Sequence, residues 1–231
     1  MLHLVTLFVL MTALALPVQA ATGVDLALVF AVDTSGSVDG REFNLQMNGI
    51  AKAITAPDVL DAAFSGPQGQ IAVCLMTWGD PDEQKSATPW RIIASAADAE
   101  AFAAEVREGL PRAGGGTGIG QAIAYGVALL RGAALQPSRM VIDVSGDGRE
   151  SWELREPRFH LIQAQAIREA AGVTVNGLAI LTDVKDLTEY YRANVIGGVG
   201  SFAMAANTYE DFAEAMHRKL LQELLPPIAQ K

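Results

Sequence analysis

Blocks of hydrophobic and polar residues alternate along the chain and predict strands and helices in turn. Continuous apolar runs are typical of strands that are buried on both faces of a parallel sheet. Such runs, together with one shorter segment, predict strands at residues 25–33, 69–80, 88–93, 139–148, 173–181 and 201–206. Amphipathic segments predict helices from about residue 40 to 54, at 95–110, from about 118 onward, and at 156–172, 186–196 and 209–225.

The alternation of strand and helix predicts an α/β fold, a doubly wound and mostly parallel sheet with helices on both faces. Pro89 places residues 88–93 at a sheet edge, since proline cannot donate to a central ladder. Asp39 and Glu42 have the spacing of a capping box at the start of the first helix. No linker or internal repeat is evident, so we expect one domain over residues 21–231.

The first twenty residues have the pattern of a secretory signal peptide. Their apolar stretch, from Leu4 to Leu16, is short for a membrane span and is followed by Pro17, and Val18 and Ala20 are the small residues that a signal peptidase requires. We expect cleavage after Ala20 and a periplasmic or secreted protein. A membrane anchor is the alternative, because residues 1–20 contain no Lys or Arg.

Composition restricts the partners and the redox chemistry. The 231 residues are 50% hydrophobic and carry a formal net charge of −9, which disfavours nucleic acid and anionic lipid as partners. We therefore expect contact with a membrane only through a partner. The single cysteine, Cys74, cannot form an internal disulfide, and its apolar surroundings predict a buried core residue.

Three loops that follow predicted strands or begin a predicted helix carry oxygen ligands. In open α/β sheets, ligands bind at the carboxyl ends of the strands, so we expect these loops to converge. Two carboxylates and three hydroxyls, without sulfur or histidine, are typical ligands of a hard cation such as Mg²⁺, with Mn²⁺ and Ca²⁺ as alternatives. The ligand residues are Asp33, Ser35 and Ser37 in the first loop, Thr117 in the second and Asp147 in the third.

The three elements DTSGS (33–37), GGGTGIGQAI (114–123) and SGDG (145–148) resemble the metal-ion-dependent adhesion site of von Willebrand factor A-type domains. The resemblance covers nearly all of residues 21–231. It implies a six-stranded sheet of order 3-2-1-4-5-6 with one antiparallel edge strand. It also implies that Ser35, Ser37 and Thr117 bind the metal directly, and that Asp33 and Asp147 hold it directly or through water. The family's third element is often Thr-Asp-Gly, whereas here Gly146 precedes Asp147.

The resemblance implies a protein-binding module in which an Asp or Glu of a partner completes the coordination of the ion, with no enzymatic activity and no small-molecule substrate. Two alternatives remain, a Mg²⁺-dependent hydrolase or phosphotransferase and a structural domain with a vestigial site. The first would need an acid/base Asp two residues after Asp33, where Ser35 stands. His160 and His217 are expected far from the three loops. Asp143, inside a predicted strand, must have polar partners or tune the metal site.

Overall fold

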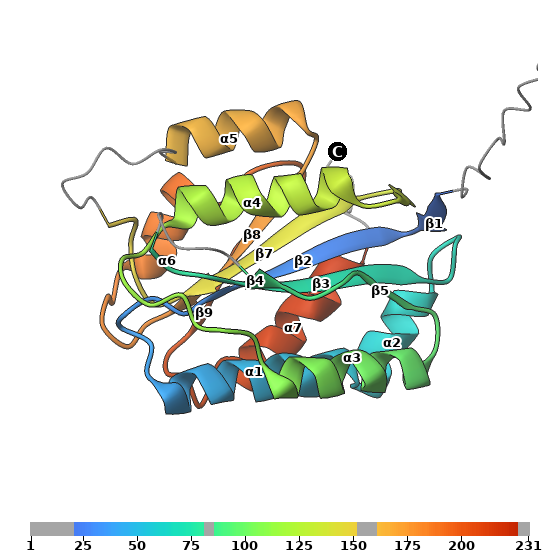
Figure 1. Cartoon of the computed structure of the whole chain (residues 1–231), viewed down its shortest axis with the longest axis horizontal. Coiled ribbons are helices and arrows are strands. Elements are labelled where there is room, and N and C mark those ends of the chain that lie inside the picture. The colour runs from blue at the N-terminus through green and yellow to red at the C-terminus, as the bar shows by residue number, and fades with distance from the viewer. Residues whose placement is uncertain (1–20, 81–85, 152–160, 226–231) are drawn as a thin grey trace, which may run out of the picture.

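The computed structural model describes residues 21–80, 86–151 and 161–225. A twisted, mostly parallel sheet lies between two layers of helices (Figure 1). Its strands follow the order β4-β3-β2-β7-β8-β9, with β5 also paired to β3, which confirms the expected order. The strands are β2 (Leu26–Asp33), β3 (Ile71–Trp78), β4 (Ser86–Ala87), β5 (Arg91–Ile93), β7 (Met140–Gly146), β8 (Thr174–Ile180) and β9 (Ala203–Ala206).

The antiparallel edge of the sheet has two short strands: β5 lies within the strand predicted at 88–93, and β4 precedes its predicted bounds. β4 and β5 both pair antiparallel with β3, and residues 88–90 separate them. Pro89 lies in this break, where its missing N–H costs no ladder hydrogen bond. The sheet thus has six strand positions, and two short strands share the edge position.

The helices cover the sheet in two layers (Figure 1). One layer holds α4 (Ile119–Gly132), α5 (Leu161–Ala170) and the short α6 (Leu187–Tyr190), which continues as a π-helical turn, Tyr191–Val195. The other layer holds α1 (Gly40–Ile54), α2 (Pro57–Phe64), α3 (Ala96–Glu108) and α7 (Phe212–Leu224). Helices on both faces bury both sides of the sheet, which explains why every residue of β2 and β3 is buried.

The start of α1 confirms the predicted capping box. The Glu42 backbone N–H donates to the Asp39 carboxylate at 2.8 Å, and the Asp39 N–H donates to the Glu42 carboxylate at 2.8 Å. This reciprocal pair satisfies two donors that the first turn would leave unpaired. It therefore fixes the point at which the chain leaves the loop after β2 and enters the helix.

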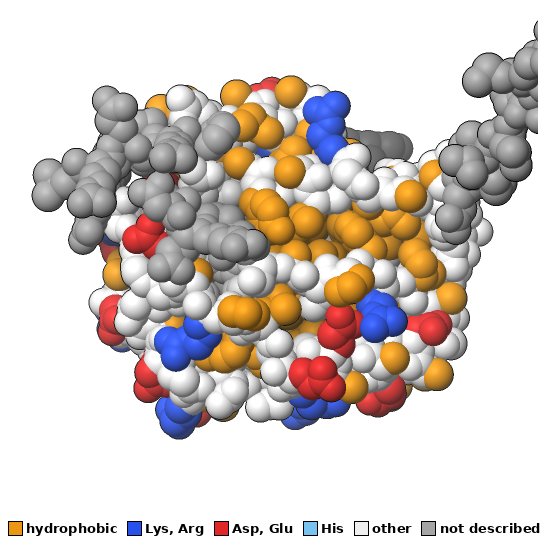
Figure 2. Space-filling model, in the orientation of Figure 1, with side chains coloured by type: hydrophobic (Ala, Val, Ile, Leu, Met, Phe, Trp, Pro, Cys, Tyr) orange, Lys and Arg blue, Asp and Glu red, His pale blue; other side chains and the backbone are white. Residues whose placement is uncertain are grey.

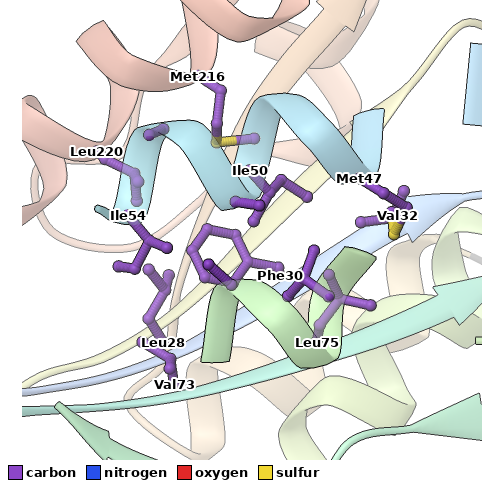
Figure 3. Packing of buried hydrophobic residues seen from close by; sticks show 14 of the residues in the cluster. Leu28, Phe30, Val32, Met47, Ile50, Ile54, Val73, Leu75, Met216 and Leu220 are labelled. Carbon is purple, nitrogen blue, oxygen red and sulfur yellow. The ribbon is translucent and has the colours of Figure 1, made fainter. Parts of the chain in front are cut away.

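The core on the α1 side of the sheet is packed around β2 and β3 (Figure 3). Alternate residues of β2, including Leu28 and Phe30, point toward α1 and α7, where Ile50 and Leu220 meet them. The Phe30 ring also stacks on Phe102 of α3, with 6.1 Å between ring centroids. The other alternate residues of β2 belong to a second apolar cluster under α4. Cys74 is buried, as expected.

Several elements differ from the sequence prediction. Helix α2 was not predicted, nor was the separate parallel pair of β1 (Thr22–Val24) with β6 (Leu135–Pro137). The segment predicted as a helix at 186–196 is the short α6 and the π turn. The predicted helix at 156–172 begins outside the described residues, and its described part is α5.

Hydrophobic and charged side chains are distributed unevenly on the face of the molecule shown in Figure 2. Hydrophobic side chains gather below α4, over the β3–β5 edge of the sheet, whereas most acidic and basic side chains lie along the lower helical layer. Within the ranges that the structure describes, every helix is too short or too polar to span a bilayer.

Candidate metal centre

The three loops with oxygen ligands meet at one edge of the sheet. β2 lies between β3 and β7 and runs parallel to both, so the carboxyl ends of all three strands face the same side. The loops after β2 and β7 lie at the end of the molecule where α1 and α4 begin, and the Thr117 loop leads into α4 at the same end (Figure 1). The convergence expected from the sequence is therefore present in the fold.

Four of the five expected ligand residues form a hydrogen-bonded chain. The Ser35 backbone N–H donates to Asp33 Oδ1 at 2.7 Å, and the hydroxyls of Ser35 and Ser37 lie 3.2 Å apart. The Ser37 hydroxyl then donates to Asp147 Oδ1 at 2.8 Å, although 110 positions separate the two residues. Asp33, Ser35 and Asp147 are buried. The chain brings two carboxylates and two hydroxyls into one cluster.

Thr117, the fifth expected residue, lies beside the Asp147 loop. A Cβ atom placed on Gly148 would lie 3.2 Å from the Thr117 hydroxyl oxygen, so the hydroxyl packs against the residue that follows Asp147. Ser151 holds Thr117 in place, because its backbone N–H donates to the Thr117 carbonyl at 3.0 Å and its hydroxyl accepts from the Thr117 N–H at 2.7 Å. The structure thus places Thr117 at the rim of the same cluster.

Thr34, which was not singled out from the sequence, ties the loops together. Its hydroxyl donates to the Trp78 carbonyl of β3 at 3.0 Å and accepts from the Ala113 N–H at 2.9 Å. Its own carbonyl accepts from the Gly114 N–H at 2.9 Å. Gly114 and Gly115 have φ of 67° and 65°, a conformation that other residues adopt only with strain. A buried threonine and two glycines thus shape the loop that carries Thr117.

Gln46 is a second buried polar residue that sequence reasoning missed. Its side-chain amide donates to the Asp33 carbonyl at 3.1 Å, and its side-chain oxygen lies 3.5 Å from the Ser145 hydroxyl. The end of β2 and the end of β7 are thereby held to α1. A sequence signal existed, because Gln46 falls in the apolar stripe of the helix, next to Met47 and one turn before Ile50.

Asp147 is held by a tyrosine from the helical layer beside α1. The Tyr209 hydroxyl, in the segment before α7, donates to Asp147 Oδ2 at 3.0 Å. Burial, and then the nearby Asp147 carboxylate, raise the pKa of Tyr209 above its usual value, so the phenol keeps its proton and remains a donor. Both carboxylate oxygens of Asp147 therefore have hydrogen-bond donors, Ser37 and Tyr209.

Asp33 is the less satisfied of the two carboxylates. Its Oδ2 atom is buried and has no hydrogen-bond partner among the described residues. Burial raises the pKa of Asp33 to about 7, whereas hydrogen bonds from Ser35 and from the Asp147 backbone oppose this rise and the Asp147 carboxylate adds to it. The carboxylate therefore has donors on one side only, and no cationic side chain is paired with it among the described residues. A divalent cation would supply a compensating positive charge, so the residues present fit the ion that the sequence predicts.

The ligand set also fits a hard cation by its chemistry. It contains oxygen alone, and only two of its five members carry a negative charge. Over the described ranges, no group of three or more His, Cys, Asp and Glu side chains is placed to hold a metal. A site built from two carboxylates and three hydroxyls does not need such a group.

Glu150 closes the loop after β7 over the start of α4. Its carboxylate accepts from the Gly120 N–H at 3.0 Å, and its own N–H donates to the Tyr190 hydroxyl at 3.2 Å. Burial raises the pKa of Glu150 to about 7, while the hydrogen bonds from Gly120 and Ile119 oppose the rise. The Glu150 carboxylate thus lies at the N-terminus of α4, the positive end of the helix dipole.

Asp143 has a cationic partner in the core, whereas its Oδ2 atom has no hydrogen-bond partner among the described residues. Lys219 of α7 lies 2.6 Å from Asp143 Oδ1 and 2.5 Å from Glu223 Oε1, and all three side chains are fully buried. The Asn176 side chain donates to the same Glu223 oxygen at 2.8 Å. This buried charge cluster lies in the core between β7, β8 and α7, which favours the structural interpretation of Asp143.

The histidines do not contribute to the metal centre as far as the structure describes them. His217 lies on α7, and its Nε2 is 2.9 Å from Asp58 of α2. His160 lies outside the described residues. The position of His217 agrees with the expectation that no histidine assists a nucleophile in the three loops.

Solved structures similar to this one include pilus proteins and a vWF domain. The TM-score is 0.60 with the pilus adhesin SpaC from Lactobacillus rhamnosus GG, at 14% identity over 89% of this chain and 31% of SpaC. It is 0.58 with the vWF domain of the type V pili tip protein Mfa5 from Porphyromonas gingivalis, at 11% identity over 90% of this chain and 98% of that domain.

A third structure, proximal thread matrix protein 1 from the mussel byssus, was solved with a zinc-occupied MIDAS motif. Its TM-score is 0.58, at 19% identity over 88% of this chain and 48% of that protein. The chain thus spans less than half the length of SpaC and of the thread matrix protein. The strand order, the helical layers and these likenesses define the fold as that of a von Willebrand factor A domain.

The chain belongs to a particular family with this fold. The family model described as "Protein of unknown function (DUF1194)" matches residues 23–228, nearly all of the chain after the expected signal peptide. No curated protein matches the chain.

Proposed function

We propose that the chain is an exported, cation-dependent protein-binding module. In this proposal a divalent ion, Mg²⁺ or alternatively Mn²⁺ or Ca²⁺, is held at the sheet edge, and an Asp or Glu of a partner protein completes its coordination. The observation that carries the proposal is the cluster of two buried carboxylates with neighbouring hydroxyls, in which Asp33 Oδ2 has no described partner. The residues that would hold the ion are Asp33, Ser35, Ser37, Thr117 and Asp147.

The balance of charge explains why such a site would attract an acidic side chain. Asp33 and Asp147 together offer two negative charges, which a divalent ion neutralises, and the hydroxyls of the other three residues are neutral. When bound, the ion supplies a Lewis-acidic position for an external carboxylate oxygen. Without the ion, Asp33 and Asp147 repel an incoming acid. An acidic side chain of a partner should therefore bind at this site only when the cation is present.

We infer that the site binds rather than catalyses. A phosphotransferase of the expected type would need a carboxylic acid where Ser35 stands, and the Ser35 N–H instead donates to Asp33 itself. His217 is paired with Asp58 on another part of the molecule. Similar solved structures bear the names of a pilus adhesin, a thread matrix protein and a pilus tip protein, which supports a binding role by analogy of fold.

Export to the periplasm or the medium is part of the proposal. Residues 1–20, the expected signal peptide, lie outside the described residues. The pilus and byssus settings named for similar structures are compatible with a binding module that acts outside the cytoplasm. The partner would then be an envelope or extracellular protein.

Calorimetric titration of the purified protein with Mg²⁺ and Mn²⁺ tests the metal site. We expect Asp33→Ala and Ser35→Ala to abolish binding, and Asp33→Asn to weaken it strongly because the change removes one charge with little change of shape. Thr117→Ala should weaken binding less if water replaces the hydroxyl. Two matched controls, Asp61→Asn and Ser65→Ala, alter exposed residues in and just after α2 and should bind metal like the wild type.

Partner binding is tested by incubating the protein with envelope extract, in Mg²⁺ and in chelator. We expect a protein that is retained in Mg²⁺, released by chelator and absent when Asp33→Ala is the bait. Equal retention by wild type and Asp33→Ala, or in chelator, would show that the edge site is not the binding surface. If the wild type itself binds no divalent ion, the proposal fails at its first step.

A further inference from the structure

Among the buried polar atoms that lack hydrogen-bond partners in the described residues, two lie close to Gly146. One is Oδ2 of Asp33, and the other is the hydroxyl oxygen of Tyr191 at the start of the π turn. Both side chains are fully buried. Buried polar atoms are nearly always paired in native proteins, so two such atoms in one region require an explanation.

Both oxygen atoms lie close to the Cα atom of Gly146. A Cβ atom built on Gly146 would be 2.6 Å from Asp33 Oδ2 and 2.9 Å from the Tyr191 hydroxyl. The two oxygens are therefore at most about 5.5 Å apart, a gap that a small side-chain rotation or one buried water bridges. The absence of a side chain at Gly146 gives both groups the room they occupy.

The hydrogen-bonding capacities of the two groups are complementary. An ionised Asp33 can only accept, and its two oxygens offer about four lone-pair sites, so the Ser35 N–H, a phenol and a cation can all be accommodated. Tyr191 carries a phenol, which is protonated at neutral pH. The phenol therefore has one hydrogen to donate.

The Tyr191 ring is confined to this position. A Cβ atom on Gly177 of β8 would be 2.6 Å from Tyr191 Cδ2, so the ring lies directly on the strand at a second glycine. Single π turns occur often at functional sites, and here the turn begins at the tyrosine. The ring is thus pinned between the π turn and the sheet, with its hydroxyl directed toward Gly146.

We propose that Tyr191 is a positioning residue of the metal centre and that its hydroxyl donates a hydrogen bond, direct or through one water, to Asp33 Oδ2. This inference rests on the proposed function. It mirrors an observed contact, since Tyr209 donates to Asp147. Tyr191 packs on the α4 side of the sheet, toward which alternation along β2 also directs Asp33, whereas Tyr209 packs in the core on the α1 side. Each carboxylate is therefore held by a tyrosine from its own side.

The position of Gly146 links the inference to the sequence. Domains with this fold often have threonine before the aspartate of the third element, and this chain has glycine. A threonine side chain would begin at a Cβ that is already within 2.6 Å of Asp33 Oδ2 and 2.9 Å of the Tyr191 hydroxyl. The Tyr191 hydroxyl, which comes from the π turn, thus occupies space that a side chain at position 146 would take.

Titration of Tyr191→Phe with Mn²⁺ tests the inference. Loss of an outer hydrogen-bond donor to a metal ligand typically weakens metal binding about 10- to 100-fold, and we expect a loss in this range. The unfolding midpoint in chelator should change little, because the ring that fills the core is retained. The matched control is Tyr125→Phe on α4, which lies about 9 Å by helical rise from the first residue of the helix and should bind Mn²⁺ like the wild type.

A second measurement does not depend on the folding of the Tyr191→Phe variant. The chain has four tyrosines, so ¹³Cζ-tyrosine labelling gives four resonances, and Phe substitution of the other three assigns Tyr191. We expect the Tyr191 resonance to shift when Mg²⁺ is added to the wild type, as the Tyr209 resonance should. A Tyr125 resonance that does not shift provides the internal reference.

The possible outcomes separate this inference from the proposed function. If the wild type binds Mn²⁺ and Tyr191→Phe binds within twofold of it, Tyr191 is only a packing residue and the inference is wrong. An unshifted Tyr191 resonance beside a shifted Tyr209 resonance has the same meaning. If the wild type binds neither ion, the proposed metal site itself fails.

Discussion

Removal of the buried Lys219 ammonium should destabilise the fold in a way that depends on pH. Lys219 is the cation between two fully buried carboxylates, 2.6 Å from Asp143 and 2.5 Å from Glu223. Lys219→Met keeps the length and the apolar character of the side-chain stem but removes the charge. Asn176 still donates to Glu223, whereas Asp143 loses its cationic partner.

The expected magnitude follows from the cost of an uncompensated buried charge. Removing one partner of a buried ion pair costs about 3–5 kcal/mol, and for a domain of this size each kcal/mol lowers the Tm by about 2–4 °C. We therefore expect the Tm of Lys219→Met to fall by about 6–20 °C at pH 8. Lys52→Met, which removes an exposed cation from α1, should stay within about 0.5 kcal/mol of the wild type.

The pH dependence is the sharper part of this prediction. Burial, and then Glu223, raise the pKa of Asp143 from 3.8 to about 7, although Lys219 opposes the rise. Between these two pH values, the folded state keeps the Asp143 proton, whereas the unfolded state has lost it. The Asp143 contribution to stability therefore declines between about pH 4 and pH 7 and is constant above pH 7.

Without Lys219 the pKa of Asp143 should rise further. The decline should then continue above pH 7, with a slope of up to about 1.4 kcal/mol per pH unit. Urea unfolding of the wild type and Lys219→Met from pH 6 to 8.5 measures this slope, and Asp143→Asn in the Lys219→Met background should remove it. Parallel stability curves for the two proteins above pH 7 would refute the electrostatic explanation.

Two further predictions concern the scaffold and the N-terminus. Thr34→Val should weaken Mg²⁺ binding, because it removes the hydroxyl that donates to the Trp78 carbonyl and accepts from the Ala113 N–H, and so loosens the glycine loop. Calorimetry measures the Mg²⁺ affinity, and an unchanged affinity would argue against an anchoring role of Thr34. Intact-mass measurement of the exported protein should show a chain that begins at Ala21, and a membrane-bound chain that retains Met1 would contradict cleavage.

The sheet could be predicted in detail because local signals agree with the global fold. The apolar runs that became β2, β3, β7 and β8 lie within a few residues of their predicted bounds, and the Asp39–Glu42 capping box is formed. Short elements were missed for the opposite reason. β1 and β6, with three residues each, exist only because they pair with one another, and no local periodicity marks a contact across the chain.

The candidate ligands could be predicted because their residue types and the fold rule for strand ends are both visible in a sequence. The residues that hold them could not, since their roles arise from tertiary contacts. Tyr209 meets Asp147 across 62 positions, and nothing local distinguishes it from Tyr190 or Tyr125. Lys219 carried a partial signal, because it falls in the apolar stripe of α7, one heptad after Phe212.

One face of β7 connects the metal centre with the buried charge cluster. Side chains alternate along a strand, so Asp143 and Ser145 of β7 point to the side of α1 and α7, and Asp147, just beyond the strand, contacts Tyr209 of the same side. Each of the three has a polar neighbour there. Lys219 contacts Asp143, Gln46 lies beside Ser145, and Tyr209 contacts Asp147.

This polar column runs through a core that is otherwise apolar on the same side. A shift of β7 by one residue would turn all three polar groups toward the α4 side, where Ile142 and Val144 now pack, and would leave their partners buried and unpaired. The column therefore selects a single register of β7 against both α1 and α7. Asp147 lies at the end of this column. The register of β7 that pairs the polar groups in the core therefore also fixes the position of the Asp147 carboxylate at the carboxyl end of the strand.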